Sequence, residues 1–497
     1  MNIQEAKNYI KDSIRMYLKK NEFGEYRVPV VRQRPIFLLG APGIGKTAIM
    51  EQIAQELSIA LVSYSMTHHT RQSALGLPFI EKKEYGGKEY AISEYTMSEI
   101  IASIYETMEE SGVNEGILFL DEINCVSETL APSMLQFLQY KTFGRHSVPE
   151  GWVIVTAGNP PEFNKSVREF DVVTMDRLKL IEVEADLKTW KNYATERGIH
   201  PAITNYLDIK KEHFYLMEMT TKGRNYVTAR GWEDLSQILY LYEEEGKQAE
   251  ESLIEQYIRN DKVVREFAAY YELYNKYKRD YRIEEILTGE YNKESTERAG
   301  NAKFDERLSL MGMLLDRLQN DIKEVMEEAE YLKELRAPLA SLKGNDDDVI
   351  QTNLATLLDA RRKLIETKSR AGALSDSERK KHLRIARFFE EALKAVNNGT
   401  GDKFGIVKNK YDGNVNGLKE TSAKVKAELH NLFAFVEEAF GNDNEMLILM
   451  TELTVHTKSS QFIATFGSED YSKHNKELML TERSADLKEE IAALNLE

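Results

Sequence analysis

The sequence predicts an α/β domain with a parallel sheet, followed by two helical regions. Up to about residue 183, short apolar runs (36–39, 59–65, 117–120 and 152–158) alternate with helix-patterned stretches (47–57 and 98–110). Strands that are apolar throughout are buried on both faces, and helices between them indicate the crossovers of a parallel sheet. From Asp186 onward strand signals are scarce. We therefore expect an α/β domain over residues 1–183, a helical lid over 184–290 and a helical C-terminal domain over 291–497.

Length and composition narrow the class of protein. The chain has 497 residues, a net charge of -16 and a single cysteine, Cys125. This excess of acid argues against a nucleic-acid groove over the whole surface but leaves a local basic patch open. No apolar run approaches the roughly 20 residues of a membrane helix, and the N-terminal stretch lacks the apolar centre of a signal peptide. We expect a cytoplasmic protein in which Cys125 is a small residue in a buried turn rather than a catalytic thiol.

The last third of the chain is charged and helical. Apolar residues there step by alternating fours and threes: Phe304, Leu308, Met311, Leu315, Leu318, Ile322, Val325, Ala329 and Leu332. This spacing predicts a coiled coil or a long helical hairpin. It could be an intramolecular hairpin, a docking arm for a partner or an oligomerisation stalk, and the first is favoured because such stripes usually form core. Before it, the polar stretch 288–303 is expected to be a linker or a long loop.

A glycine-rich loop, GAPGIGKT at residues 40–47, lies between the first strand and the first core helix. It fits the pattern G-x-x-x-x-G-K-[ST], in which glycines let successive backbone N–H groups point at a phosphate beside the positive end of a helix. Lys46 would reach the β- and γ-phosphate oxygens, and the Thr47 hydroxyl would ligate Mg²⁺. The flanking strand and helix disfavour an ordinary turn. We expect the nucleotide to be held by Gly40, Ala41, Pro42, Gly43, Ile44, Gly45, Lys46, Thr47 and Ala48.

A pair of acids ends the third core strand, in GILFLDEIN at residues 116–124. Acidic groups at the end of a buried strand are costly unless a metal or substrate compensates them. Asp121 would hold Mg²⁺, and Glu122 would polarise the attacking water. The alternative is a solvated acidic turn, which the upstream loop makes less favourable. Loop and acids together predict binding and hydrolysis of ATP with Mg²⁺.

Three later motifs complete the pattern. The fourth core strand ends at Asn159, which can orient the attacking water, although Asn159 could also merely end a strand. Arg177 follows in VVTMDRLKLIEVE, and Arg230 begins a helix in YVTARGWEDLSQIL. Over residues 30–245 this order resembles the AAA+ ATPases, and within them the MoxR-like group. The resemblance implies that Asn159 is the first sensor, Arg230 the second sensor, and Arg177 an arginine finger that reaches the neighbouring subunit.

The sequence departs from that group at two positions. Leu178 follows Arg177 where phenylalanine is commoner, and Gly231 follows Arg230 where alanine is frequent. Neither departure touches the phosphate loop, but both weaken the exact assignment of roles. Arg168 is a rival finger because it also lies beyond the fourth core strand, and a single arginine on a charged segment is usually a solvated salt-bridge partner.

The resemblance also implies an assembly and a kind of work. A finger donated to a neighbour requires a homo-oligomeric ring, typically a hexamer, and the group performs chaperone-like activation or maturation of a partner that often has a von Willebrand factor A domain. The helical C-terminal third would then be the adaptor for that partner. Two rivals are a DNA-translocating motor subunit of a restriction-type nuclease, against which the net charge argues, and a non-enzymatic nucleotide switch, against which Lys46, Asp121 and Glu122 argue.

Other features have weaker interpretations. The adjacent His68 and His69 lack further ligands at metal-binding spacing, so we expect polar loop residues. Thr67 could hold Glu122 back until a partner arrives. Around Gly86-Gly87, residues 79–92 have the pattern of a two-residue β-hairpin, which could project into the pore of a ring, with Tyr85 and Tyr90 contacting a client, or simply cover a sheet edge. Residues 139–151 are a second insertion of this kind.

Overall fold

The computed structural model describes residues 1–68, 74, 76–163, 166–220, 223–399 and 402–476. Its contacts divide the chain into two compact units. Unit 1 comprises Met1–Lys191, Thr228–Gly231 and Thr356–Phe389, and unit 2 comprises Asn192–Val227, Trp232–Ala355 and Glu390–Glu497. Two helices of the last third therefore contribute their adjoining ends to the unit that holds the glycine-rich loop. The division into three domains at residues 183 and 290 stays a prediction.

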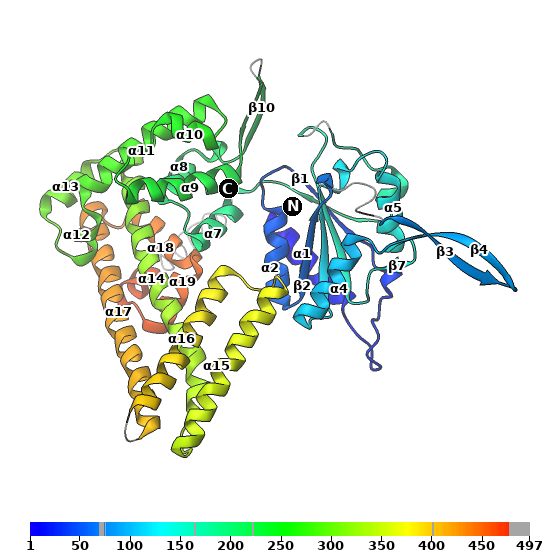
Figure 1. The fold of residues 1–497 in the computed structure, drawn as a ribbon. Helices are drawn as coiled ribbons and strands as arrows, with labels where there is room; N and C mark the ends of the chain where they lie inside the picture. Colours follow the sequence, from blue (N-terminus) through cyan, green and yellow to red (C-terminus); the bar gives the residue numbers. More distant parts are fainter. Residues whose placement is uncertain (69–73, 75, 164–165, 221–222, 400–401, 477–497) are drawn as a thin grey trace, which may run out of the picture. The chain divides into compact units, whose positions relative to one another are not determined.

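Unit 1 is built on a five-stranded parallel sheet in the order β2-β5-β8-β1-β9 (Figure 1). Its strands are β1 (Ile36–Gly40), β2 (Ala60–Ser65), β5 (Gly116–Asp121), β8 (Trp152–Gly158) and β9 (Lys179–Val183). All seven residues of β8 are buried, as expected for a strand with neighbours on both sides and layers on both faces. The predicted α/β class and its four core strands are confirmed, and the helical regions that follow are confirmed as well.

Several helices of unit 1 begin at a residue whose side chain caps them. They are α1 (Ile3–Tyr17), α2 (Lys46–Leu57), α4 (Glu99–Ser111), α5 (Ala131–Tyr140), α6 (Val172–Met175) and the first residues of α7 (Leu187–Arg197). At the start of α4, the Ser98 hydroxyl accepts a hydrogen bond from the backbone N–H of Ile101, and Gly112 ends the helix in the left-handed conformation. Such caps satisfy backbone groups that have no partner within the helix.

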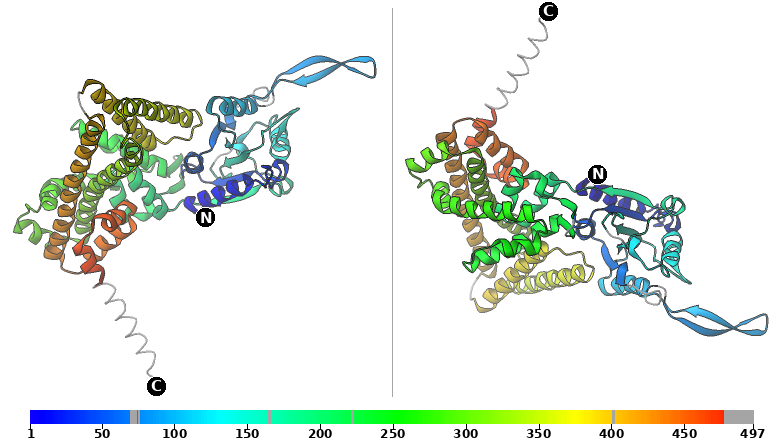
Figure 2. Two further views of the ribbon diagram at one scale, coloured as in Figure 1. Left: turned by 90° about the horizontal axis from the view of Figure 1, so that it is seen from below. Right: turned by 90° about the horizontal axis from the view of Figure 1, so that it is seen from above.

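Two β-hairpins extend from unit 1. Strands β3 (Pro78–Tyr85) and β4 (Lys88–Tyr95) pair antiparallel across Gly86 and Gly87, whose φ angles are 59° and 79°. Positive φ at both central residues is what a two-residue hairpin turn requires, so the predicted hairpin is confirmed. Its two strands form a ribbon that projects away from the parallel sheet (Figure 2). The second insertion forms the short pair β6 (Thr142–Phe143) and β7 (His146–Ser147).

The turn between α15 (Asp347–Arg370) and α16 (Asp376–Asn398) belongs to unit 1. The backbone N–H of Leu61 in the edge strand β2 donates to the carbonyl oxygen of Ala371 at 3.1 Å. Ala371 and Ala373 are 1% and 3% exposed and lie in the hydrophobic cluster that also contains Ala60 and Ile104. This turn therefore covers an edge of the sheet that would otherwise expose backbone groups.

Unit 2 is mainly helical. Its elements are α8 (Pro201–Ile209), the strands β10 (Leu216–Thr220) and β11 (Gly223–Val227), most of α9 (Ala229–Glu244), α10 (Glu251–Tyr257), α11 (Asp261–Tyr281), α12 (Ile283–Thr288), α13 (Lys293–Asn301), α14 (Phe304–Ala340), α17 (Lys403–Phe440), α18 (Asn444–Val455) and α19 (Thr457–Phe466). The apolar stripe of residues 304–332 lies on α14, where most of it is buried against α17, α18 and α19. The interpretation of this stripe as intramolecular core is therefore confirmed.

Two features of unit 2 differ from the sequence analysis. The prediction of a linker or long loop over residues 288–303 is wrong, because most of this stretch is the helix α13. Its N-cap is Asn292, whose side chain accepts from the backbone N–H of Ser295 at 2.9 Å, and Thr296 and Ala299 alone supply its buried face. A helix with so small a buried face leaves little periodic signal. The antiparallel pair β10–β11 was missed for a similar reason, since its strands have five residues each.

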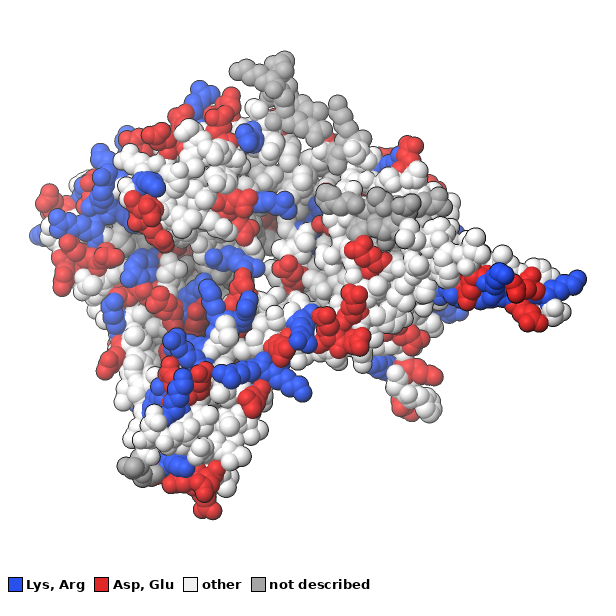
Figure 3. Space-filling model, viewed as in Figure 1, with Lys and Arg blue, Asp and Glu red and all other residues white. Residues whose placement is uncertain are grey.

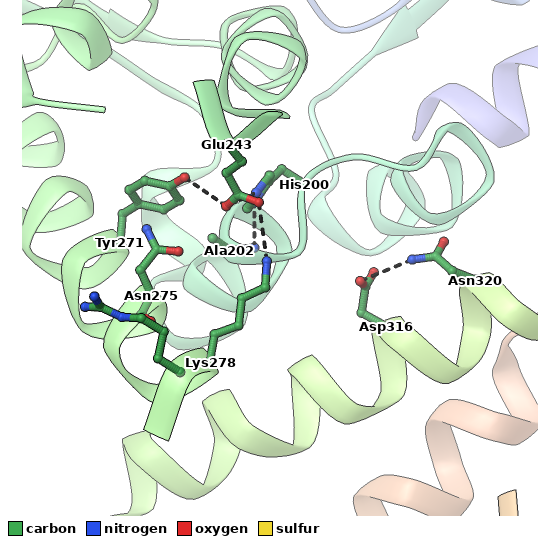
Figure 4. A network of polar contacts seen from close by, with 9 residues as sticks. His200, Ala202, Glu243, Tyr271, Asn275, Lys278, Asp316 and Asn320 are labelled. Atoms are coloured by element: carbon green, nitrogen blue, oxygen red, sulfur yellow. Dashed lines mark hydrogen bonds and ion pairs between the residues drawn. The ribbon is translucent and has the colours of Figure 1, made fainter. Parts of the chain in front are cut away.

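A polar network lies within unit 2 around Glu243 (Figure 4). Its carboxylate contacts the His200 ring at 3.0 Å, the Tyr271 hydroxyl at 3.0 Å and the Lys278 ammonium at 3.3 Å. Burial would raise the pKa of Glu243, but the hydrogen bond and charge of His200, with those of Lys278 and Tyr271, lower it to about 2. The network links α9, α11 and the start of α8.

Among the described residues, no helix is both long enough and apolar enough to cross a membrane.

Candidate nucleotide-binding site

The glycine-rich loop joins the end of β1 to the start of α2. Gly43 and Gly45 have φ angles of 74° and 94°, which side chains rarely tolerate. A Cβ atom at Gly40 would lie 2.7 Å from the carbonyl oxygen of Val183 and 2.9 Å from the Ile44 side chain. The glycines therefore permit both the curl of the loop and its packing against β9. A loop of this shape ahead of a helix N-terminus is suited to binding phosphate.

Lys46 occupies the centre of this loop. Its ammonium donates to the carbonyl oxygens of Gly40 and Ala41, both at 2.8 Å, and to the side-chain oxygen of Asn159 at 2.9 Å. Lys46 is 8% exposed. Burial, together with the positive charge of Arg230, lowers the pKa of Lys46 to about 8 against the opposing effects of Asp121 and Glu122. The structure thus places Lys46 in contact with Asn159 and within reach of the charge of Arg230.

Thr47 and Asp121 form the second part of the site. The Thr47 hydroxyl donates to a carboxylate oxygen of Asp121 at 2.9 Å, and the other carboxylate oxygen accepts from the backbone N–H of Glu122 at 2.9 Å. A hydroxyl and a carboxylate so close together are oxygen donors of the kind that Mg²⁺ prefers. The described residues contain no cluster of three His, Cys, Asp or Glu side chains suited to a metal. A magnesium ion held here would draw its remaining ligands from water and substrate phosphates.

Glu122 lies just beyond the end of β5 with a φ angle of 55°, which is costly for a residue with a side chain. One of its carboxylate oxygens accepts from the hydroxyls of Ser65 and Thr67, each at 3.0 Å. The contact with Thr67 matches the weak suggestion from the sequence, whereas Ser65 was missed. The signal for Ser65 is its register, because it ends β2 directly opposite Asp121.

Asn124 was also missed by the sequence analysis. Its side-chain amide donates to the backbone carbonyl of Asn159 at 2.8 Å, and a Cβ atom at Gly158 would lie 2.4 Å from its side-chain oxygen. Asn124 is 4% exposed. It therefore fixes the backbone of the residue whose side chain contacts Lys46, and it requires a glycine at the end of β8.

Arg230 lies in the first turn of α9, near enough for its charge to act on Lys46. The Thr228 hydroxyl accepts from the backbone N–H of Gly231 at 3.1 Å, which caps this helix. The same side chain packs against the loop, since a Cβ atom at Gly43 would meet the Thr228 Cβ at 3.0 Å. Thr228 therefore positions both the helix that carries Arg230 and the phosphate loop.

The two candidate fingers lie elsewhere in unit 1. Arg168 pairs with Glu128, and its backbone N–H donates to the carbonyl oxygen of Asn124 at 2.9 Å. Arg177 is exposed just after α6. Hydrogen bonds from Thr174, and after them the charge of Arg177, lower the pKa of Asp171. Neither arginine is among the partners of Lys46 that the described residues show. Both have the exposure that an arginine acting on a neighbouring subunit would need.

Two further candidates from the sequence are Cys125 and the pair His68 and His69. Cys125 is half-buried in the short helix η3 (Ile123–Cys125), next to the acid pair. His69 lies outside the described residues, and the side chain of His68 is also outside them, so the interpretation of this pair stays a prediction.

The comparison with protein families agrees with this geometry. A family model, described as ATPase family associated with various cellular activities (AAA), matches residues 36–175. No curated protein sequence matches the chain. A solved chain titled "Structure of C. elegans PCH-2" is 14% identical with a TM-score of 0.24, over 44% of this chain and 50% of that chain. The family match includes the loop, both acids and Asn159. The chain therefore contains an AAA ATPase domain.

Proposed function

We propose that this chain is an ATP-hydrolysing remodelling ATPase of the MoxR-like kind. The observation that carries the proposal is the convergence of Lys46, Thr47, Asp121, Glu122 and Asn159 at the carboxyl ends of three parallel strands. This edge of a parallel sheet is where such folds bind ligands. A nucleotide switch without turnover would need the loop but not a water-polarising glutamate.

Each side chain has a distinct task in hydrolysis. Lys46 holds the β- and γ-phosphate oxygens in place of the two backbone carbonyls that it contacts in the structure. Thr47 and Asp121 would hold Mg²⁺, which neutralises charge that develops on the phosphates. Asn159 orients the attacking water, and Glu122 polarises it once the hydroxyls of Ser65 and Thr67 release the carboxylate. Arg230 stabilises the transferred phosphoryl group.

We further propose that the site is completed by a second copy of the chain in a ring, for which a hexamer is the expected size. Arg177 is the preferred finger because the Arg168 guanidinium is already paired with Glu128. In this arrangement hydrolysis moves the helices that follow Arg230 relative to the sheet, and that motion acts on a partner protein. A partner with a von Willebrand factor A domain is the favoured class.

The decisive experiment compares ATP turnover by the wild-type chain and the Glu122→Gln variant in the presence of Mg²⁺. Loss of the carboxylate should lower turnover by at least about a hundredfold while ATP binding is retained, because the side chain acts on water rather than on the nucleotide. Glu150→Gln, at an exposed glutamate, is the matched control. Equal turnover by Glu122→Gln and the control would rule out this function, and so would a folded wild-type protein that binds no nucleotide.

A further inference from the structure

Two acids, Asp321 of α14 and Glu428 of α17, meet in the apolar seam between these two helices of unit 2. The helices are 37 and 38 residues long and pack against each other (Figure 1). Buried apolar side chains lie one turn before and one turn after each acid: Leu318 and Val325 on α14, and Val425 and Leu432 on α17. The two carboxyl groups are thus placed where such helices normally bury hydrocarbon.

Burial of this degree is unusual for an acid of this chain. Figure 3 shows carboxylates on the surface, where water and nearby lysines and arginines surround them. Among the residues that the structure describes, the buried acids are Glu428 and Glu445, each 5% exposed. The Glu445 carboxylate has the Arg307 guanidinium at 3.2 Å, whereas the cation beside Glu428 is the exposed ammonium of Lys424 at 3.5 Å. Because a buried charge is costly without a close partner, Glu428 is poorly compensated as a carboxylate.

Each of the two acids also has one oxygen without a hydrogen-bond donor. Arg317 pairs with Oδ1 of Asp321. Oδ2 of Asp321 and Oε2 of Glu428 are buried and have no hydrogen-bond partner among the described residues. An ionised carboxylate can only accept hydrogen bonds, so two carboxylates within hydrogen-bonding reach of each other repel unless a proton lies between them.

We propose that Asp321 and Glu428 share one proton, and that this proton clamps α14 to α17 in a pH-dependent way. One carboxyl group holds the proton and donates it to the other carboxylate, so that a single O–H···O hydrogen bond satisfies both groups. Loss of the proton leaves two like charges in an apolar seam. The inference concerns the packing of unit 2 alone, and it holds whether or not the chain hydrolyses ATP.

The charged groups that act on the pair come from three helices. Burial, and after it the charge of Asp321, raises the pKa of Glu428, and Lys424 opposes both effects. Arg317 of α14 interacts with Asp321 and Glu428 and also with Glu284 of α12. Two positive groups therefore face three carboxylates, and one added proton makes the cluster neutral.

The clamp should weaken as pH rises. In an opened seam Glu428 titrates near the ordinary pKa of 4.5, whereas in the closed seam its pKa is higher. The stabilisation is therefore fully present below pH 4.5 and is lost as pH rises through the raised pKa. Over that window the equilibrium constant for opening should rise by up to about tenfold per pH unit, as expected for one proton.

Amide hydrogen exchange of the full chain without nucleotide, from about pH 5 to about pH 8, tests the clamp. The readout is the protection of residues 420–436 of α17, expressed relative to the intrinsic exchange rate at each pH. In the wild-type chain this protection should fall by about tenfold or more across the range. We choose α17 because Asp316 of α14, whose burial raises its pKa to about 7, adds a dependence of the same sign on its own helix.

Three variants assign the effect. Glu428→Gln keeps the shape of the side chain, and its amide can always donate to Asp321, so protection should change by less than about twofold with pH and should exceed wild type at about pH 8. Asp321→Asn supplies the donor from the other side and should also lose the dependence. Glu420→Gln removes a carboxylate from an exposed position about two turns earlier on α17 and should behave like wild type.

Four results would overturn the proposal. Constant protection in the wild-type chain would mean that no proton is shared, and a dependence that persists in Glu428→Gln would assign it to another group. Loss of the dependence in Glu428→Gln but not in Asp321→Asn would mean that burial of Glu428 acts alone. Protection restored at about pH 8 by about 10 mM CaCl₂ or MgCl₂, in the wild-type chain but not in Glu428→Gln, would make the pair a cation site instead.

Discussion

Strand β2 has two different neighbours, one near each end. At its carboxyl end, Ser65 donates to Glu122 in a polar cluster assembled from strand ends. Four residues earlier, about 13 Å along the strand, Leu61 donates to Ala371 at the α15–α16 turn, where the contacts are apolar. The first contact comes from motifs of the α/β region, and the second comes from a segment near the far end of the chain. One strand therefore connects the candidate catalytic glutamate to the turn between α15 and α16.

The largest expected effect is on ATP hydrolysis at the candidate site beside the carboxyl end of β2. If Arg177 completes the site of a neighbouring subunit, Arg177→Ala should lower ATP turnover by about a hundredfold or more with ATP binding unchanged. Lys46→Ala should also be inactive, because it loses the phosphate contact. A mixture of the two inactive variants should recover activity, since an intact loop in one chain can face an intact Arg177 in the other. Turnover is measured as a function of mixing ratio.

The control for that mixture is Arg168→Ala. Because the Arg168 guanidinium pairs with Glu128, its loss should lower turnover by no more than a few-fold. Activity of Arg177→Ala equal to wild type would exclude Arg177 as the finger. If Arg168→Ala is inactive alone and its mixture with Lys46→Ala recovers activity, the finger is Arg168.

The second prediction concerns the other end of β2. Ala371→Asp places a carboxylate in a hydrophobic cluster at a position that is 1% exposed, so it should lower the free energy of unfolding by about 2–4 kcal/mol. Ser377→Asp, at an exposed position in the first turn of α16, adds the same charge and should change stability by less than about 0.5 kcal/mol. Urea unfolding followed by circular dichroism compares the two. Equal free energies of unfolding for Ala371→Asp and Ser377→Asp would mean that the turn is not part of the core.

The same comparison shows what sequence reasoning could reach. The loop, the acid pair and the strand ending at Asn159 were predictable because each is a contiguous motif with a strand or helix beside it. Ser65 and Asn124 were not, since their roles depend on register between strands rather than on local pattern. Register becomes visible only when strand order is known.

No local sequence pattern predicts that the turn between α15 and α16 packs against the parallel sheet. The structure has a break between Arg370 and Asp376, but nothing in the sequence of that stretch indicates that Ala371 would be buried against β2. Small residues at a turn are found exposed to solvent as well as buried in a core. Likewise, the short helix α13 carries too few apolar residues to be separated from a loop by its periodicity.

A third prediction uses the protonation of Lys46. Burial lowers its pKa to about 8 in the chain without nucleotide, and bound phosphates would raise that pKa. Below pH 8 the lysine is charged before ATP arrives, whereas above pH 8 binding must take up a proton, so affinity should fall by up to about tenfold per pH unit. The pH dependence of stability has the opposite sign to that of ATP affinity. Because the unfolded chain keeps the Lys46 proton up to the ordinary pKa of a lysine, this group makes the free energy of unfolding rise with pH from pH 8 upward.

Calorimetric titration of ATP at pH 9, in two buffers with different ionisation enthalpies, measures that proton uptake. Lys46→Arg, which stays charged at this pH, is the control and should bind ATP without the proton uptake. Lys141 is also buried with a pKa of about 8, but it lies away from the loop and should not respond to nucleotide. Proton uptake that persists in Lys46→Arg would assign it to another group.

The smallest expected effect lies at the hydroxyls that hold Glu122. Thr67→Val removes one of the two donors to its carboxylate while Ser65 remains, so basal ATP turnover should rise by about two- to fivefold as the released form becomes more populated. Thr67→Ser keeps the hydroxyl and should behave like wild type. If turnover instead falls in Thr67→Val and is restored in Thr67→Ser, the hydroxyls position the glutamate for catalysis rather than restrain it. In that case β2 would promote hydrolysis through the same contact.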